Sequence, residues 1–137
     1  MTDADGTAVP VGLAVNSFTS VSLDPPLVLF CAGTTSSTWP KIRAAGHFCV
    51  NILGAQQEDV SRAMAGKSPD KFVGVGWRQE ASGAPVLEGS LAWIDCEIHD
   101  VVTAGDHDLV LGLVQAIGHN DGAPLCYYRG GYSSLGH

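Results

Sequence analysis

Alternating and continuous apolar runs dominate the chain, and both patterns predict strands. Residues 11–15 place Val, Leu and Val at every second position, the period of a half-buried strand, whereas residues 27–30 are continuously apolar, as in a strand buried on both faces. Pro25 and Pro26 separate these runs and exclude a continuous helix or ladder through them. Residues 16–22 carry five small polar side chains in seven positions. The pattern therefore predicts two strands joined through a polar middle.

Further strands are predicted over residues 47–53, 86–87, 91–102 and 107–116. The last two form a predicted antiparallel hairpin whose tip contains Gly105 and Asp106. In the first strand of this hairpin, Trp, Asp, Glu and His occupy positions 93, 95, 97 and 99. We therefore expect that side of the strand to face water.

Three short helices are predicted between the strands. The first covers residues 41–45, with Pro40 in its first turn and Gly46 after its end. The second covers residues 55–65, and the third begins at residues 68–70 with a Ser-Pro-Asp start signal. Because strands dominate, the elements predict a mostly β fold, an antiparallel barrel with short inserted helices.

Composition and charge narrow the class of protein. A chain of 137 residues with 45% hydrophobic content fits one domain with a substantial core. No apolar run approaches the roughly 18 residues of a membrane span, and the acidic, polar N-terminus is unlike a signal peptide. We therefore expect a cytoplasmic protein. The net charge of −7, with seven scattered basic residues, argues against binding of nucleic acid.

The four cysteines, Cys31, Cys49, Cys96 and Cys126, stand alone in apolar stretches. None belongs to a C-x-x-C pair or has a histidine at ligand spacing, so we expect buried thiols in a reducing compartment and no metal site. The sequence also lacks a nucleophile elbow, a P-loop and a metalloprotease motif. No catalytic side chain is predicted, which leaves cofactor chemistry as the main enzymatic option.

Two polar stretches are candidates for binding a ligand. The small residues Gly12, Ala14 and Ser17 would let a flat ligand approach the backbone, and the Asn16 amide would meet polar ring edges or phosphate oxygens. The alternative interpretation is a Ser/Thr-rich bend outside the barrel. Residues 34–38, five hydroxyl residues before the first helix, suit an anion or serve only to cap the helix. Both interpretations are open for each stretch.

Several stretches resemble the flavin reductase domain found in the small reductase components of two-component flavin monooxygenases. Residues 16–28, NSFTSVSLDPPLV, are close to the family's SSFTSVSLDPPLV. Residues 105–107, followed by Gly112, are similar to its G-D-H-x-x-x-x-G pattern. Residues 124–132 resemble its P-L-x-Y-Y-R-G-x-Y ending, and residues 70–72 its D-K-F.

The resemblance implies a fold and an activity. The fold would be the FMN-binding split barrel, an antiparallel split β-barrel that usually forms homodimers with each flavin near the subunit interface. The activity would be that of an NAD(P)H-dependent flavin reductase, in which NADH or NADPH reduces FMN or FAD. The reduced flavin would then pass transiently to a separate oxygenase component. In such an enzyme the flavin carries the difficult chemistry, so no nucleophile is needed.

The resemblance also implies roles for individual residues. Residues 36–38 would hold the flavin phosphate, and His107 and Tyr132 would contact the nicotinamide cofactor. The flavin-binding set comprises Gly12, Leu13, Ala14, Asn16, Ser17, Phe18, Ser22, Ser36, Ser37, Thr38 and Lys71. Taken without the resemblance, Lys71 could equally be a solvated surface lysine, His107 an exposed turn residue and Tyr132 a cover for the barrel end.

The resemblance covers residues 1–137 as one flavin reductase-like domain, without the N-terminal helix and first strand usual in the family. Either the true start of the protein lies upstream or the chain is a shortened variant. We expect the seam left by that strand to be closed by something else. Two other functions are compatible with the sequence. One is a non-catalytic split-barrel flavin carrier, and the other is a related flavin-dependent oxidoreductase acting on another substrate. Turnover of NADH with free flavin would separate a reductase from a carrier.

Overall fold

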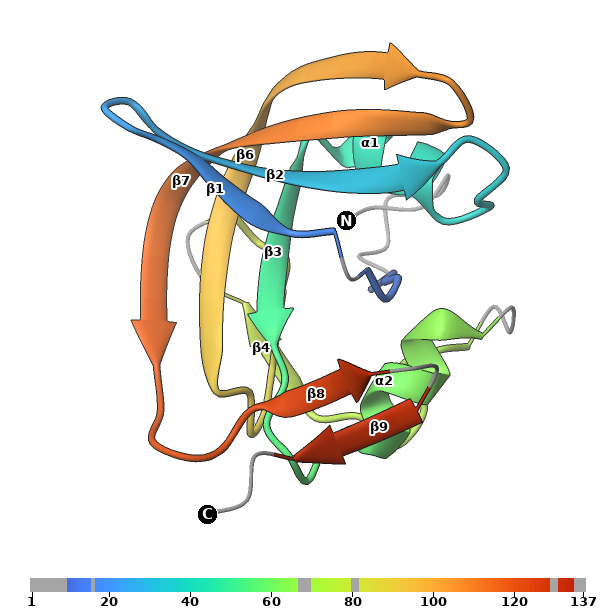
Figure 1. Ribbon diagram of the computed structural model, residues 1–137, viewed down its shortest axis with the longest axis vertical. Coiled ribbons are helices and arrows are strands. Elements are labelled where there is room, and N and C mark those ends of the chain that lie inside the picture. Colours follow the sequence, from blue (N-terminus) through green and yellow to red (C-terminus); the bar gives the residue numbers. More distant parts are fainter. Residues whose placement is uncertain (1–9, 16, 67–69, 80–81, 129–130, 135–137) are drawn as a thin grey trace.

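The computed structural model describes residues 10–15, 17–66, 70–79, 82–128 and 131–134 (Figure 1). These residues form mostly strands, with two short helices between them. In chain order the elements are β1 (Thr19–Leu23), β2 (Pro26–Gly33), α1 (Trp39–Ala45), β3 (His47–Ile52), α2 (Glu58–Ala65), β4 (Trp77–Gln79), β5 (Pro85–Leu87), β6 (Ala92–Ala104), β7 (His107–His119), β8 (Leu125–Tyr128) and β9 (Gly131–Ser134). In the described part of the chain, neither helix is long and apolar enough to cross a membrane.

The main sheet is antiparallel, with the strand order β1-β2-β7-β6-β3. β2 pairs with the first half of β7, from Gly33 opposite His107 to Leu27 opposite Leu113. β3 pairs with the first half of β6. Figure 1 shows the long β6–β7 hairpin bending between these two regions. The register shifts near Asp95 and near residues 98–100, and such bulges bend strands.

The core lies against one face of this bent sheet. Phe30 contacts Phe48 and Trp39 edge to face, with ring centroids 4.9 and 6.0 Å apart. A Cβ at Gly112 would come within 2.5 Å of the Phe48 ring, so β7 needs glycine there for the ring to pack against the strand. The buried core residues are Val28, Phe30, Ala32, Trp39, Ile42, Phe48, Cys96 and Val110.

Much of the predicted secondary structure is confirmed. The hairpin over β6 and β7 has its turn at Gly105 and Asp106, and β2 and β3 coincide with predicted runs. The helix predicted over residues 41–45 is α1, and Gly46 ends it with φ 81°, where its N–H bonds the carbonyl oxygens of Ile42 and Arg43.

Three predictions are wrong. Residues 11–15 alternate because Val11 and Leu13 pack against the core, but no described strand pairs with them, and the first strand is β1. Residues 71–74 form turns instead of a helix, while residues 67–69 lie outside the described part of the chain. Asp95 is fully buried and not on a wet face, because the bulge beside it shifts the alternation of β6.

Candidate functional site

A polar cavity of about 910 Å³ opens beside the C-terminal end of β2. Its walls come from segments far apart in sequence: residues 13–15 with Ser17, the loop between β2 and α1, the end of α2, and the start of β7. The cavity collects most of the predicted polar ligand residues, namely Ser17, Ser36, Ser37, Thr38, Lys71 and His107. The fold therefore brings residues 36–38 and His107, which lie about seventy positions apart in the sequence, into one cavity.

The loop of residues 34–38, here the hydroxyl loop, is shaped by Ser36. Its Oγ accepts hydrogen bonds of 3.2 Å from the backbone N–H groups of both Thr38 and Trp39. Ser36 therefore satisfies the first amides of α1, which is the capping role that the sequence left open for residues 34–38. The Thr38 side chain does not cap the helix, and Ser37 is exposed. The hydroxyl groups of Ser37 and Thr38 consequently line the cavity without being used to cap the helix.

Lys71 holds three parts of the cavity wall together. Its Nζ donates to the carbonyl oxygens of Gly12 and Met64, both at 2.9 Å, and to Oγ1 of Thr38 at 3.3 Å. These acceptors match the three hydrogens of an ammonium group. Because Thr38 Oγ1 accepts from Lys71, its own hydrogen can be donated to a ligand. Burial lowers the pKa of Lys71.

His107 is fixed by its neighbour in the β6–β7 turn. Nδ1 lies 2.8 Å from Oδ1 of Asp106, and this hydrogen bond, together with the charge of the imidazolium form, lowers the pKa of Asp106. An ionised carboxylate can only accept, so Nδ1 carries the hydrogen. In the neutral ring Nε2 is then an acceptor. The His107 side chain is 51% exposed, so Nε2 is accessible to a ligand.

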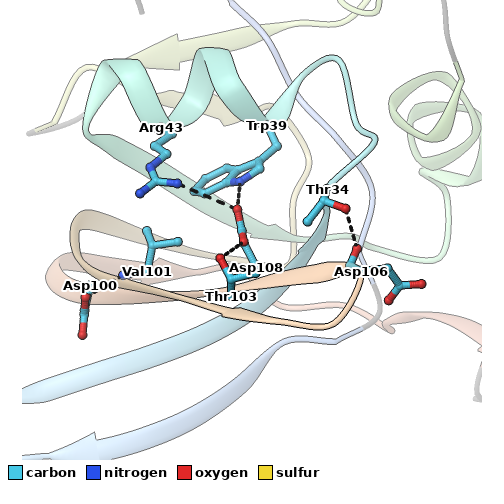
Figure 2. A network of polar contacts seen from close by, with 8 residues as sticks. All are labelled: Thr34, Trp39, Arg43, Asp100, Val101, Thr103, Asp106 and Asp108. Atoms are coloured by element: carbon cyan, nitrogen blue, oxygen red, sulfur yellow. Dashed lines mark hydrogen bonds and ion pairs between the residues drawn. The ribbon is translucent and has the colours of Figure 1, made fainter.

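A buried carboxylate on β7 joins α1 to the hairpin (Figure 2). Oδ2 of Asp108 accepts from Nε1 of Trp39 at 2.8 Å and lies 3.9 Å from the guanidinium of Arg43, while Oδ1 accepts from Oγ1 of Thr103 at 2.8 Å. The bonds from Trp39 and Thr103, with Arg43 nearby, lower the pKa of Asp108. The role of this carboxylate was not predicted from the sequence. One feature of the sequence could have indicated it: Asp108 lies at the same every-second position of the strand as the buried residues Val110 and Gly112.

Ser17 acts as a substitute for a strand partner at the edge of β2. Its Oγ accepts from the backbone N–H of Cys31 at 2.9 Å and donates to the carbonyl oxygen of the same residue at 3.3 Å. The side chain thus continues the β1–β2 ladder past Thr19, the first residue of β1. It fixes the chain where it borders the cavity.

A second, mainly apolar cavity of about 350 Å³ lies behind residues 13–15, which border both cavities. Gly12 and Phe18 line this one, and a Cβ at Gly12 would come within 2.8 Å of the Met64 sulfur. Ser22 lies on β1 and lines neither cavity. Asn16 lies outside the described residues, and the side chain of Tyr132 in β9 does as well. Leu13, Ala14 and Val15 therefore form an apolar partition between the two cavities.

The residues of the polar cavity fit a ligand that has both a phosphate and a flat ring. Four hydroxyl-bearing residues of the hydroxyl loop line the cavity beside the ammonium of Lys71, and such groups hold phosphate oxygens. Leu13 and Ala14 provide apolar surface beside them. Among the described residues, no group of histidine, cysteine, aspartate and glutamate side chains is arranged to hold a metal ion.

Comparisons with known proteins agree with this chemistry. Residues 2–136 match the family described as flavin reductase like domain. A flavin reductase from Pseudomonas putida is 50% identical over 125 residues, which cover 90% of this chain and 74% of that protein. The flavin-dependent monooxygenase reductase subunit HsaB of Mycobacterium tuberculosis is 47% identical over 130 residues, covering 93% of this chain and 70% of the relative.

Solved structures are similar as well. A nitrilotriacetate monooxygenase component B homologue from Mycobacterium thermoresistibile has a TM-score of 0.91 and 46% identity, covering 98% of this chain and 76% of that one. The NADH:FAD oxidoreductase SgcE6 of Streptomyces globisporus, solved with NAD and FAD fragments, has a TM-score of 0.86 and 35% identity, covering 92% and 81%.

Proposed function

The chain belongs to the flavin reductase-like domain family, and we propose that its polar cavity binds both the flavin and the nicotinamide cofactor. The fold is the antiparallel split barrel of flavin reductases. The protein is an NAD(P)H:flavin oxidoreductase that supplies reduced flavin to a flavin-dependent monooxygenase. Its substrates are FMN or FAD and NADH or NADPH. One observation supports the site above all: the hydroxyl loop, Lys71 and His107 share one cavity.

The bound flavin supplies the acceptor for a hydride from nicotinamide C4. The protein has to bind the two rings face to face and exclude water, and no side chain has to take a proton. In this proposal Ser37 and Thr38 donate to phosphate oxygens, with the charge of Lys71 nearby. Leu13, Ala14 and Ser17 border the ring.

His107 is assigned to the nicotinamide side. With its hydrogen on Nδ1, the neutral ring offers Nε2 as an acceptor for the carboxamide N–H₂ of nicotinamide. Tyr132 is assigned to the same side because it matches the family's closing motif. Ser22, Phe18 and Gly12 do not line the polar cavity, so we assign them an indirect role in flavin binding.

The activity is tested with purified protein, NADH or NADPH, and free FMN or FAD, by following the loss of NADH absorbance. The proposed function predicts catalytic turnover that depends on added flavin. A carrier without a nicotinamide site would bind flavin and leave NADH unoxidised, and that outcome would contradict the proposal.

The phosphate site is tested by comparing FMN with riboflavin, which lacks the phosphate. Ser37→Ala removes a hydroxyl that α1 does not use, and it should weaken FMN by about 1.5–3 kcal/mol while leaving riboflavin unchanged. The triple change to alanine at residues 36–38 should enlarge the selective loss, although it also removes the cap formed by Ser36. Ser20→Ala on exposed β1 is the control. Equal losses for both ligands would place the phosphate elsewhere.

We further propose that the protein is a cytoplasmic homodimer. β1 is the edge of the main sheet, and it leaves Val21 and Leu23 exposed by 50% and 90%. Covering such an edge protects it from unwanted pairing. Sedimentation should give twice the chain mass, and Leu23→Asp should shift it toward the monomer. A wild-type protein that sediments as a monomer at micromolar concentration would contradict this part of the proposal.

A further inference from the structure

We infer that Asp108 is a positioning residue that, through Trp39, fixes the spacing between the hydroxyl loop and His107. The inference rests on the proposed function, because it concerns how the two halves of one cavity are held relative to each other. Figure 2 shows four of the anchoring residues, Thr34, Trp39, Thr103 and Asp108, which come from the loop after β2, α1, β6 and β7.

Asp108 is built into the protein and is not a surface charge. The residue is 7% exposed, and both carboxylate oxygens accept hydrogen bonds of 2.8 Å, one from Trp39 and one from Thr103. Arg43, 3.9 Å away, is the nearby cation. A buried carboxylate is tolerated only with such partners. Because Trp39 belongs to α1 and Thr103 to β6, the carboxylate ties the helix to the hairpin.

Trp39 transmits this anchoring to the hydroxyl loop. It is the first residue of α1 and is 3% exposed, with its ring packed edge to face against Phe30. Its Nε1 donates to Asp108, and its backbone N–H donates to Oγ of Ser36. Both N–H groups of one rigid residue are therefore fixed. The position of Ser36 depends on where Asp108 holds the indole.

The other end of the hydroxyl loop, at Thr34, is held by the β6–β7 turn. The backbone N–H and Oγ1 of Thr34 donate to the carbonyl oxygen of Asp106, at 2.9 and 3.1 Å. The loop is thus attached at Thr34 to residue 106 and through Trp39 to residue 108. His107 lies between these two attachment points. Successive side chains of a strand point to opposite faces, so Asp108 faces α1 while His107 borders the cavity.

This arrangement sets the distance between the assigned phosphate site and the assigned nicotinamide site. Hydride transfer requires the two rings to be in contact, and a misplacement of about 1 Å can cost on the order of a hundredfold in rate. Releasing Trp39 from Asp108 would let the hydroxyl loop move relative to His107. FMN binding and NADH use should then be impaired together.

The inference is tested with variants that separate positioning from stability. Trp39→Phe keeps an aromatic ring against Phe30 and removes the Nε1 donor. Asp108→Ala removes the acceptor, whereas Asp108→Asn keeps an oxygen that can accept from the indole. Thr103→Val is the matched control, since it removes the other hydrogen bond to Asp108 without touching α1. Each purified variant is measured for its Kd for FMN and riboflavin, its KM for NADH and its Tm.

Trp39→Phe and Asp108→Ala should raise the ratio of the FMN Kd to the riboflavin Kd by about three- to tenfold and raise the NADH KM. Asp108→Asn should restore both toward the wild-type values, and Thr103→Val should lower Tm only. If Asp108→Ala does not fold, Trp39→Phe decides. Equal ratios and equal KM values in Trp39→Phe and Thr103→Val would overturn the inference. Failure of the proposed function shows in the wild type itself, which would leave NADH unoxidised, and the inference would fall with it.

Discussion

The ammonium of Lys71 donates a hydrogen bond of 2.9 Å to the carbonyl oxygen of Gly12, across 59 positions of sequence. Residues 10–15 have no strand partner among the described residues, so this contact ties them to the rest of the fold. The second carbonyl acceptor, Met64, is in the last turn of α2, where helical carbonyl oxygens lack partners. One side chain therefore joins a helix end, the hydroxyl loop and an otherwise unpaired segment.

Lys71→Met should lower the free energy of unfolding by about 1–3 kcal/mol, because two backbone carbonyl oxygens lose their charged donor. It should also weaken the binding of FMN and of riboflavin to a similar degree, since both ligands contact the cavity wall that Lys71 holds together. Urea unfolding and flavin titration measure the two effects, with Lys41→Met on the exposed side of α1 as the control. A loss confined to FMN would instead indicate direct contact between Lys71 and the phosphate.

A bulky side chain at position 17 should block the binding of flavin in the polar cavity. Ser17→Leu places a bulky side chain on the cavity wall and removes both bonds to Cys31, so quenching of flavin fluorescence should be lost. Ser17→Ala keeps the residue small, and it should retain binding while losing about 1 kcal/mol of stability. Ser20→Leu, on exposed β1, should bind flavin normally. Wild-type quenching by the Ser17→Leu variant would show that the ring binds elsewhere.

The carboxylates around the β6–β7 turn predict loss of stability in acid. The folded pKa of Asp108 lies below its ordinary value of 3.8, so the unfolded chain binds more protons in the window between the two values. The stabilisation is therefore complete above that window and is lost as the pH falls through the folded pKa. Asp108→Asn should flatten the decline in urea midpoint between about pH 5 and pH 3. Asp24→Asn at an exposed turn is the control, and parallel curves for both would contradict the assignment.

The four cysteines should differ in how fast they are alkylated. Burial, reinforced by the nearby carboxylate of Asp95, raises the pKa of Cys49 and of Cys96 to about 12. At about pH 8 only about one thiol in ten thousand is then ionised, and the thiolate is the reactive form. Iodoacetamide should modify Cys31 and Cys126 first, as followed by peptide mass spectrometry, and reach the other two only after unfolding. Alkylation of Cys96 as fast as Cys31 in the native protein would contradict this expectation.

Strand and helix positions were predictable where hydrophobic periodicity coincides with pairing. The β6–β7 hairpin and α1 with Gly46 are such cases, because burial pattern, turn residues and caps agree. Residues 11–15 show the limit: alternation reports burial of Val11 and Leu13, but it does not reveal whether a neighbouring strand exists. The bulge beside Asp95 likewise places this residue on the buried side of β6, although the alternation in the sequence predicts the solvent-facing side.

Within the candidate site, Lys71 and His107 were predictable only through resemblance to a family, whereas the two polar stretches were ligand candidates from their residues alone. Ser36, Ser37, Thr38 and His107 were named from motifs, and the fold brings them to one cavity. Their supports were not predicted, because the bond from Trp39 to Asp108 and the bonds from Thr34 to Asp106 span about seventy positions. Contacts of that range depend on sheet register, which a single sequence does not specify.

The most direct test of the shared cavity is steady-state kinetics of His107→Ala with NADH and FMN, combined with FMN titration. The side chain borders the cavity, and its Nδ1 is held by the carboxylate of Asp106. The change should lower kcat/KM for NADH by roughly five- to thirtyfold, a loss of about 1–2 kcal/mol, and leave the FMN Kd unchanged. The control is His99→Ala, which removes an exposed histidine of β6 and should behave as wild type. Unaltered NADH kinetics together with lost FMN binding would contradict the account, because His107 would then belong to the flavin side.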